Sequence, residues 1–100
     1  MNTKEIINGI IASGGSARDH AMRAITAAKS ADFEEANKWI KKSNQSLHEG
    51  HKLQSQLMEV EENGQLSEIT LLMIHAQDHI MTASSLKDLA VEIIYLHKEK

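Results

Sequence analysis

The chain has no cysteine and no proline, and its 100 residues include only five glycines and three aromatic side chains. Without cysteine, neither a disulfide framework nor a thiolate metal site can form. The absence of proline, together with the abundant Ala, Ile, Leu and Met residues, favours long uninterrupted helices over sheet. We therefore expect an all-α protein.

An excess of positive charge is also missing. The formal net charge is -3, and the 11 Lys and Arg residues are scattered along the sequence. A nucleic-acid-binding face or a strongly basic membrane-surface helix is therefore not expected. The apolar stretch from Ile6 to Ile11 is too short and too interrupted for a signal sequence or a membrane span. The expected location is the cytoplasm.

The length predicts a single domain over residues 1–100. A chain of this size buries only a little over roughly 60% of its unfolded surface, so its own core stabilises it modestly. Oligomerisation is the common remedy when disulfides are absent.

Apolar residues recurring at steps of three and four predict three helices, at about 3–30, 32–62 and 67–97. Asp32, with Glu35 three residues later, forms the pattern of a helix N-cap. Asn63-Gly64 is a helix end, and Ser67 or a neighbour is expected to cap the third helix. The short first connection makes the first two helices an antiparallel hairpin, giving an antiparallel three-helix bundle.

Two features of the first two helices have more than one explanation. Gly14-Gly15 lies in the middle of the first helix, where each glycine costs about 1 kcal/mol relative to alanine. The pair indicates either close helix packing or a kink, or else room for a neighbouring side chain or partner. In the second helix, His48 and His51 are interpreted as surface histidines, because two ligands without a third make a poor metal site.

The third helix carries more apolar residues than two partner helices can cover. One stripe contains Ile69, Leu72, Met73, Ala76, Ile80, Ala83, Ala90 and Ile94. Further apolar residues spread over the other faces, namely Leu71, Ile74, Met81, Leu86, Leu89, Val91 and Ile93. A helix that is apolar nearly all round is buried on nearly all sides. The third helix should therefore pack against copies of itself or another protein.

Three ionisable residues interrupt this apolar helix. His75, Asp78 and His79 are three and four residues apart, which brings them to one side of a helix. A neutral imidazole has a ring nitrogen free to act as nucleophile, base or ligand. The histidines could instead be core or interface residues satisfied by hydrogen bonds. A carboxylate amid apolar residues needs a cation, a donor or a proton, so Asp78 is harder to explain as purely structural.

The segment Leu72–Ala83, with His-Ala-Gln-Asp-His at its centre, closely resembles the signature of enzyme IIA proteins of the lactose, cellobiose and chitobiose branch of the sugar phosphotransferase system. The resemblance covers the whole chain, including Gly14–Arg18, Ala27–Ala36 and Leu89–Ile94. It implies a homotrimer of three-helix subunits. It also implies a phosphocarrier for uptake of a β-linked disaccharide.

The resemblance assigns a role to each residue of the motif. His75 would accept a phosphoryl group from HPr and pass it to a cysteine of the cognate IIB protein. Asp78 would lie near the three-fold axis, where members of the family hold a divalent cation, here Mg²⁺. Gln77 would lie beside the phosphoryl group, and His79 would have a supporting role. Because Gln77 is two residues from His75, it points to another side of the helix, so such a contact would have to form across a subunit or docking interface.

A hypothesis of another class remains. His75, Asp78 and His79 could form a structural metal site in a non-catalytic helical oligomer, although one helix seldom places more than two ligands well. No H-E-x-x-H pattern is present, which argues against a zinc hydrolase.

Overall fold

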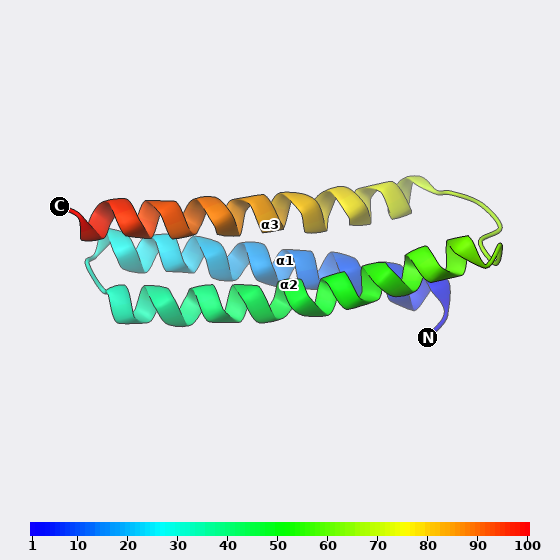
Figure 1. Cartoon of the computed structure of the whole chain (residues 1–100), viewed down its shortest axis with the longest axis horizontal. Coiled ribbons are helices and arrows are strands. Elements are labelled where there is room, and N and C mark those ends of the chain that lie inside the picture. The colour runs from blue at the N-terminus through cyan, green and yellow to red at the C-terminus, as the bar shows by residue number, and fades with distance from the viewer.

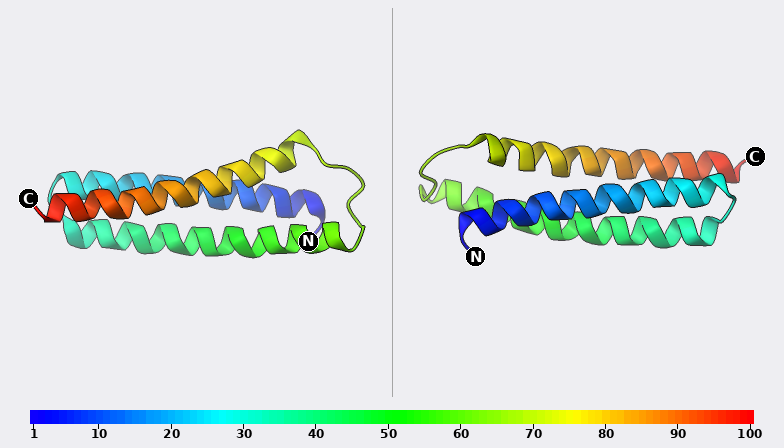
Figure 2. Two further views of the ribbon diagram at one scale, coloured as in Figure 1. Left: turned by 45° about the horizontal axis from the view of Figure 1, so that its top comes forward. Right: turned by 180° about the vertical axis from the view of Figure 1, so that it is seen from behind.

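The computed structural model describes all residues 1–100 and consists of α1 (Thr3–Lys29), α2 (Phe33–Glu62) and α3 (Leu71–Lys98). The helices run side by side in a rod of 53 × 19 × 16 Å, with α1 and α2 joined by a tight turn at one end and α2 and α3 by a longer linker at the other (Figure 1). Views from other directions show that α3 also lies alongside α1 (Figure 2). The predicted all-α three-helix bundle is confirmed. None of the helices combines the length and apolarity needed to cross a membrane.

The turn between α1 and α2 has one predicted and one unpredicted feature. As expected, Asp32 caps α2, and its carboxylate accepts a hydrogen bond from the Glu35 N–H at 3.1 Å. Ahead of it, Ala31 adopts φ 61°, in the left-handed region. Its N–H donates to the Ala28 carbonyl at 3.0 Å, and the Asp32 N–H donates to the Ala27 carbonyl at 2.9 Å. These two bonds form a Schellman motif that ends α1.

The same motif ends α2, where the sequence predicts it. Gly64 is left-handed, with φ 69°, and its N–H donates to the Glu61 carbonyl at 3.0 Å. The Gln65 N–H donates to the Val60 carbonyl at 3.0 Å. The prediction of a glycine-terminated helix at this point is confirmed.

The predicted start of the third helix is wrong by a few residues. The N-cap is Thr70 rather than Ser67, and α3 begins at Leu71. The Thr70 hydroxyl accepts a hydrogen bond from the Met73 N–H at 3.2 Å, and the Met73 side chain is buried in the core. The Thr70 N–H in turn contacts the Met73 sulfur at 3.5 Å, which completes a capping box between the two residues.

The core divides into two clusters along the rod. The larger cluster contains Ile6, Ile7, Ile10, Ala17, Leu47, Leu57, Met73, Ala76, Ile80 and Ala83. The smaller one, near the α1–α2 turn, contains Ala24, Ala28, Ala36 and Ile94. Between them, the fully buried Ser43 donates a hydrogen bond from its hydroxyl to the Ala17 carbonyl at 2.8 Å. The abundant alanines let the helix backbones approach closely.

The outer side of α3 is apolar and has no partner within the chain. The inner stripe is confirmed for Met73, Ala76, Ile80, Ala83, Ala90 and Ile94, which are buried. The prediction that Ile69 and Leu72 belong to that stripe is wrong: both are exposed, since Ile69 lies before α3 and Leu72 lies in its first turn. Large exposed apolar side chains on α3 are Leu71, Leu72, Ile74, Met81, Leu89, Val91, Tyr95 and Leu96. The predicted surplus of apolar surface on this helix is therefore confirmed.

Candidate functional site

His75 lies on the second turn of α3 and is exposed. Its ring stacks on that of His79, one turn further along, with a centroid separation of 5.7 Å and an interplanar angle of 18°. No side chain or backbone group of the chain makes a hydrogen bond or ion pair with the His75 ring. Its nitrogens are therefore available to a molecule arriving from solvent.

His79 is half-buried against α1, where Gly14 makes room for it. A Cβ atom at Gly14 would lie only 2.8 Å from Cδ2 of His79 and 3.3 Å from its backbone carbonyl carbon. A Cβ atom at Gly15 would lie 3.6 Å from Nε2 of His79, an ordinary contact. Helix α1 continues without interruption through both glycines. Close packing and room for a neighbouring side chain are thus the same feature, and Gly14 provides it.

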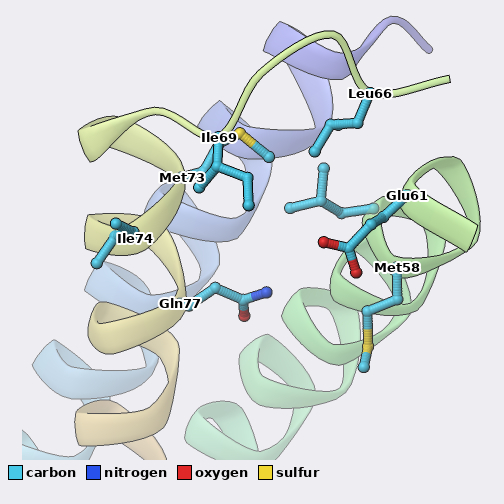
Figure 3. Close-up of a pocket in the computed structure, with 8 residues that line it drawn as sticks. Met58, Glu61, Leu66, Ile69, Met73, Ile74 and Gln77 are labelled. Atoms are coloured by element: carbon cyan, nitrogen blue, oxygen red, sulfur yellow. The ribbon is translucent and has the colours of Figure 1, made fainter. Parts of the chain in front are cut away.

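Gln77 faces α2 rather than His75. It is half-buried, and its Oε1 accepts a hydrogen bond from Nε2 of Gln54 on α2. The close-up in Figure 3 shows its side chain pointing from α3 toward α2 at the end of a pocket. The pocket has a volume of about 190 Å³ and is lined by Leu57, Met58, Glu61, Leu66, Ile69, Met73, Ile74 and Gln77. This direction agrees with the expectation that Gln77, two residues from His75, points to another side of the helix.

Asp78 points outward from α3 and is exposed, with no hydrogen bond or ion pair to its carboxylate. Its neighbours on successive turns are Ile74 and Met81, which are 51% and 61% exposed. The hydroxyl of Thr82 donates to the backbone carbonyls of Asp78 and His79, at 2.9 and 3.1 Å. This hydroxyl engages the helix backbone and leaves the Asp78 carboxylate free.

The three ionisable side chains do not form a metal site in one chain. His79 packs on α1, Asp78 points away from the bundle, and no group of three His, Asp or Glu side chains in the chain could hold a metal ion. A metal site made by His75, Asp78 and His79 of one chain is therefore not supported, whereas the alternative of such a site in an oligomer stays a prediction.

Two other assignments can be compared with the structure. His48 and His51 are both exposed on α2, as predicted. Sequence reasoning missed Gln54 as a partner of Gln77. The available signal was a polar residue within the apolar stripe of α2, because such a residue needs a hydrogen-bond partner when it is partly buried.

Comparison with known proteins adds independent findings. The family model of the lactose/cellobiose-specific IIA subunit of the phosphotransferase system matches residues 5–98. The lichenan-specific phosphotransferase enzyme IIA component of Bacillus subtilis is 47% identical over 96 residues, covering 96% of this chain and 87% of that protein. The crystal structure of the cellobiose-specific enzyme IIA from Bacillus anthracis has a TM-score of 0.92 and 39% identity, covering 99% of this chain and 92% of that chain. The IIA(Chitobiose) solution structure, determined in complex with HPr for the Escherichia coli phosphotransferase system, has a TM-score of 0.86 and 32% identity, covering 99% of this chain and 96% of that one.

Proposed function

Because the chain belongs to the lactose/cellobiose-specific IIA family of the sugar phosphotransferase system, we propose that it carries phosphoryl groups on His75 from HPr to a cysteine of a cognate IIB protein. The observation that supports this most directly is the exposed His75 ring, which has no polar partner in its own chain. HPr is proposed as the donor because the similar IIA(Chitobiose) was solved in complex with it. The relay would operate in the cytoplasm.

Each transfer exchanges one bond to phosphorus for another. A neutral ring nitrogen of His75 attacks the phosphoryl group of phospho-HPr, and the bond from phosphorus to HPr breaks with its electron pair returning to HPr. In the second step the thiolate of the IIB cysteine attacks. A phosphorus–sulfur bond then forms as the bond to His75 breaks, and His75 recovers its lone pair. The cysteine must release its thiol proton before attack, because the thiolate is the nucleophile.

Such a transfer requires positioning and neutralisation of charge on the phosphoryl oxygens. His75 lies within a helix, where no free N–H groups of a helix N-terminus are available. Donors must therefore come from side chains, a second subunit or HPr. The Gln77 amide nitrogen is one candidate, since only its oxygen is used in the bond from Gln54. Gln77 of one subunit would reach the phosphoryl group of another or of a docked partner, and His79 supports the His75 ring.

The exposed side of α3 supports assembly as a homotrimer. Leu71, Met81 and Leu89 are 82%, 61% and 60% exposed in the single chain, which is costly for large apolar side chains in water. In a trimer built on this face, three Asp78 carboxylates would meet near the axis. Their mutual repulsion would be relieved by a divalent cation such as Mg²⁺. The cation would stabilise the assembly.

The saccharide is not decided by this chain. The similar proteins described above are named for lichenan, cellobiose and chitobiose. A protein that exchanges phosphoryl groups with other proteins does not need to contact sugar, so specificity would lie in the membrane component. A β-linked disaccharide is the proposed class of cargo.

Phosphoryl labelling tests the acceptor. Incubation with phosphoenolpyruvate, enzyme I and HPr should add one acid-labile phosphoryl group per chain, detected by intact-protein mass spectrometry. His75→Ala should abolish the label, whereas His48→Ala, a matched exposed helical histidine, should retain it. Full labelling of His75→Ala would exclude His75 as the acceptor.

Oligomer mass and metal content test the role of Asp78. Asp78→Leu should change the trimer mass measured by light scattering, or the bound metal measured by elemental analysis. Asp88→Leu is the matched control, because Asp88 is exposed on the same helix but has Lys87 beside it at 2.8 Å. An unchanged trimer with unchanged metal in Asp78→Leu would refute the proposal for this residue.

A further inference from the structure

The ring of His79 fits into a gap in α1 that exists only because residue 14 lacks a Cβ atom. The same ring also stacks on that of His75, with the ring centroids 5.7 Å apart. From this chain of contacts we propose that Gly14 is a positioning residue for His75, acting through His79. The inference rests on the proposed function of His75 as phosphoryl acceptor. Its structural step, the coupling of three residues on two helices, can be measured separately.

The first contact is steric. A Cβ atom at Gly14 would lie 2.8 Å from Cδ2, 3.3 Å from Cγ and 3.3 Å from the backbone carbonyl carbon of His79. The ring atom can move only by rotating the side chain. The backbone atom can move only if α1 and α3 separate, which well-packed interiors resist. An alanine at position 14 should therefore displace the His79 ring before it displaces the helices.

The second contact transmits this displacement. The His75 ring is exposed and makes no hydrogen bond within the chain. Its one aromatic neighbour is the stacked His79 ring. Side chains on a helix surface occupy a few rotamers, and a neighbouring ring one turn away selects among them. Moving His79 frees or shifts the His75 ring. Displacements of about 1 Å at a reacting group lower rates by up to roughly a hundredfold.

The neighbouring glycine provides a matched control. Gly14→Ala and Gly15→Ala both replace a mid-helix glycine of α1, and both should gain helix propensity to the same extent. A Cβ atom at Gly15 makes only an ordinary contact, 3.6 Å from Nε2 of His79. Both variants lose a flexible residue. A difference between them in transfer rate or in NMR signals is therefore caused by the loss of space at position 14.

The test measures two independent quantities. The rate of phosphoryl transfer from phospho-HPr should fall roughly ten- to a hundredfold in Gly14→Ala and stay near the original value in Gly15→Ala. Both variants should still reach one phosphoryl group per chain. The side-chain NMR signals of His75, recorded without any phosphoryl donor, should shift in Gly14→Ala only. Unchanged His75 signals and an unchanged rate in a folded Gly14→Ala would overturn the proposal.

A double-mutant cycle tests whether His79 is the intermediary. His79→Ala should slow transfer and shift the His75 signals by itself, and adding Gly14→Ala should then change neither further, because the two act through one contact. If Gly14→Ala lowered the transfer rate by the same factor with and without His79→Ala, helix separation and not His79 would be responsible. If Gly14→Ala fails to fold, His79→Ala alone decides, since unchanged signals and rate would refute the coupling. If wild-type protein is never phosphorylated, the proposed function fails, while the NMR signals still test the positioning.

Discussion

Replacing Ala31 by glycine should stabilise the bundle, because Ala31 is the one residue other than glycine with a positive φ. At φ 61° its Cβ atom lies close to the following carbonyl oxygen, which costs an L residue roughly 1–2 kcal/mol. Glycine has no such penalty, but it loses about 0.5–1 kcal/mol more backbone entropy on folding. The difference predicts that Ala31→Gly raises the free energy of unfolding by about 0.5–1 kcal/mol, which corresponds to a few degrees in Tm.

The other end of the rod provides the reciprocal experiment. Gly64 occupies the same position in a second Schellman motif, with φ 69°, and a Cβ atom there would meet nothing within 4 Å. Gly64→Ala should therefore destabilise the protein by a similar amount, for backbone reasons alone. The turn between α1 and α2 contains position 31, and the linker between α2 and α3 contains position 64. These two connections lie at opposite ends of the bundle (Figure 1), so the two effects should add to nearly zero in the double variant.

Urea denaturation followed by circular dichroism measures all three variants. Protein concentration must be the same throughout, because oligomerisation makes the apparent stability concentration-dependent. The slope of the free energy of unfolding against urea concentration should be the same in all variants. A constant slope would mean that the substitutions change stability and not the compactness of the folded or unfolded state. Destabilisation by Ala31→Gly would refute the reasoning. So would an increase in stability from Gly64→Ala.

Three other substitutions test individual contacts by the same denaturation assay. Ser43→Ala removes a buried hydrogen bond and should lower the free energy of unfolding by about 1 kcal/mol. Ser55→Ala, on the exposed side of α2, should be nearly neutral. Equal effects of the two substitutions would show that the hydrogen bond to the Ala17 carbonyl does not stabilise the protein. Gly50→Ala would bring a Cβ atom to 2.5 Å from Cδ1 of the fully buried Ile80 and should cost about 1–3 kcal/mol. Adding Ile80→Val, which removes that atom, should restore part of this loss, and strict additivity would argue against the clash. Thr70→Ala removes the cap of α3 and should lower the free energy of unfolding by about 1 kcal/mol. An unchanged free energy of unfolding would contradict the explanation that Thr70 determines where α3 begins.

Local signals in the sequence were sufficient where the determining atoms are close in the chain. The cap at Asp32 and the left-handed glycine at position 64 depend on a few neighbouring residues, and both predictions are confirmed. The start of α3 was mispredicted because Ser67 and Thr70 are both good caps, three residues apart. In the structure Met73 completes a capping box with Thr70, whereas the usual sequence pattern has Glu or Gln at that position. The left-handed Ala31 had no local signal, since alanine does not favour that conformation.

The contacts of the candidate site depend on the alignment of helices, which periodicity does not supply. The sequence predicted that Gln77 faces away from His75, because that follows from rotation about one helix. Its partner Gln54 depends on how α2 is aligned with α3, and helical stripes leave that alignment open by whole turns. In the same way, Gly14 could be interpreted only when its neighbour across the α1–α3 interface was known to be His79.

Within five residues, α3 directs four side chains to different surroundings, and this explains why the motif is so compact. Successive residues of a helix are rotated by about 100°, so His79 meets α1, Gln77 meets α2, and Asp78 between them points outward. His75, one turn before His79, shares its side of the helix and is supported by its ring while remaining exposed. Inserting one residue between Gln77 and His79 would rotate all later contacts by the same angle. The spacing of the motif is therefore set by the directions of the two helices beside α3 and of the open face opposite them.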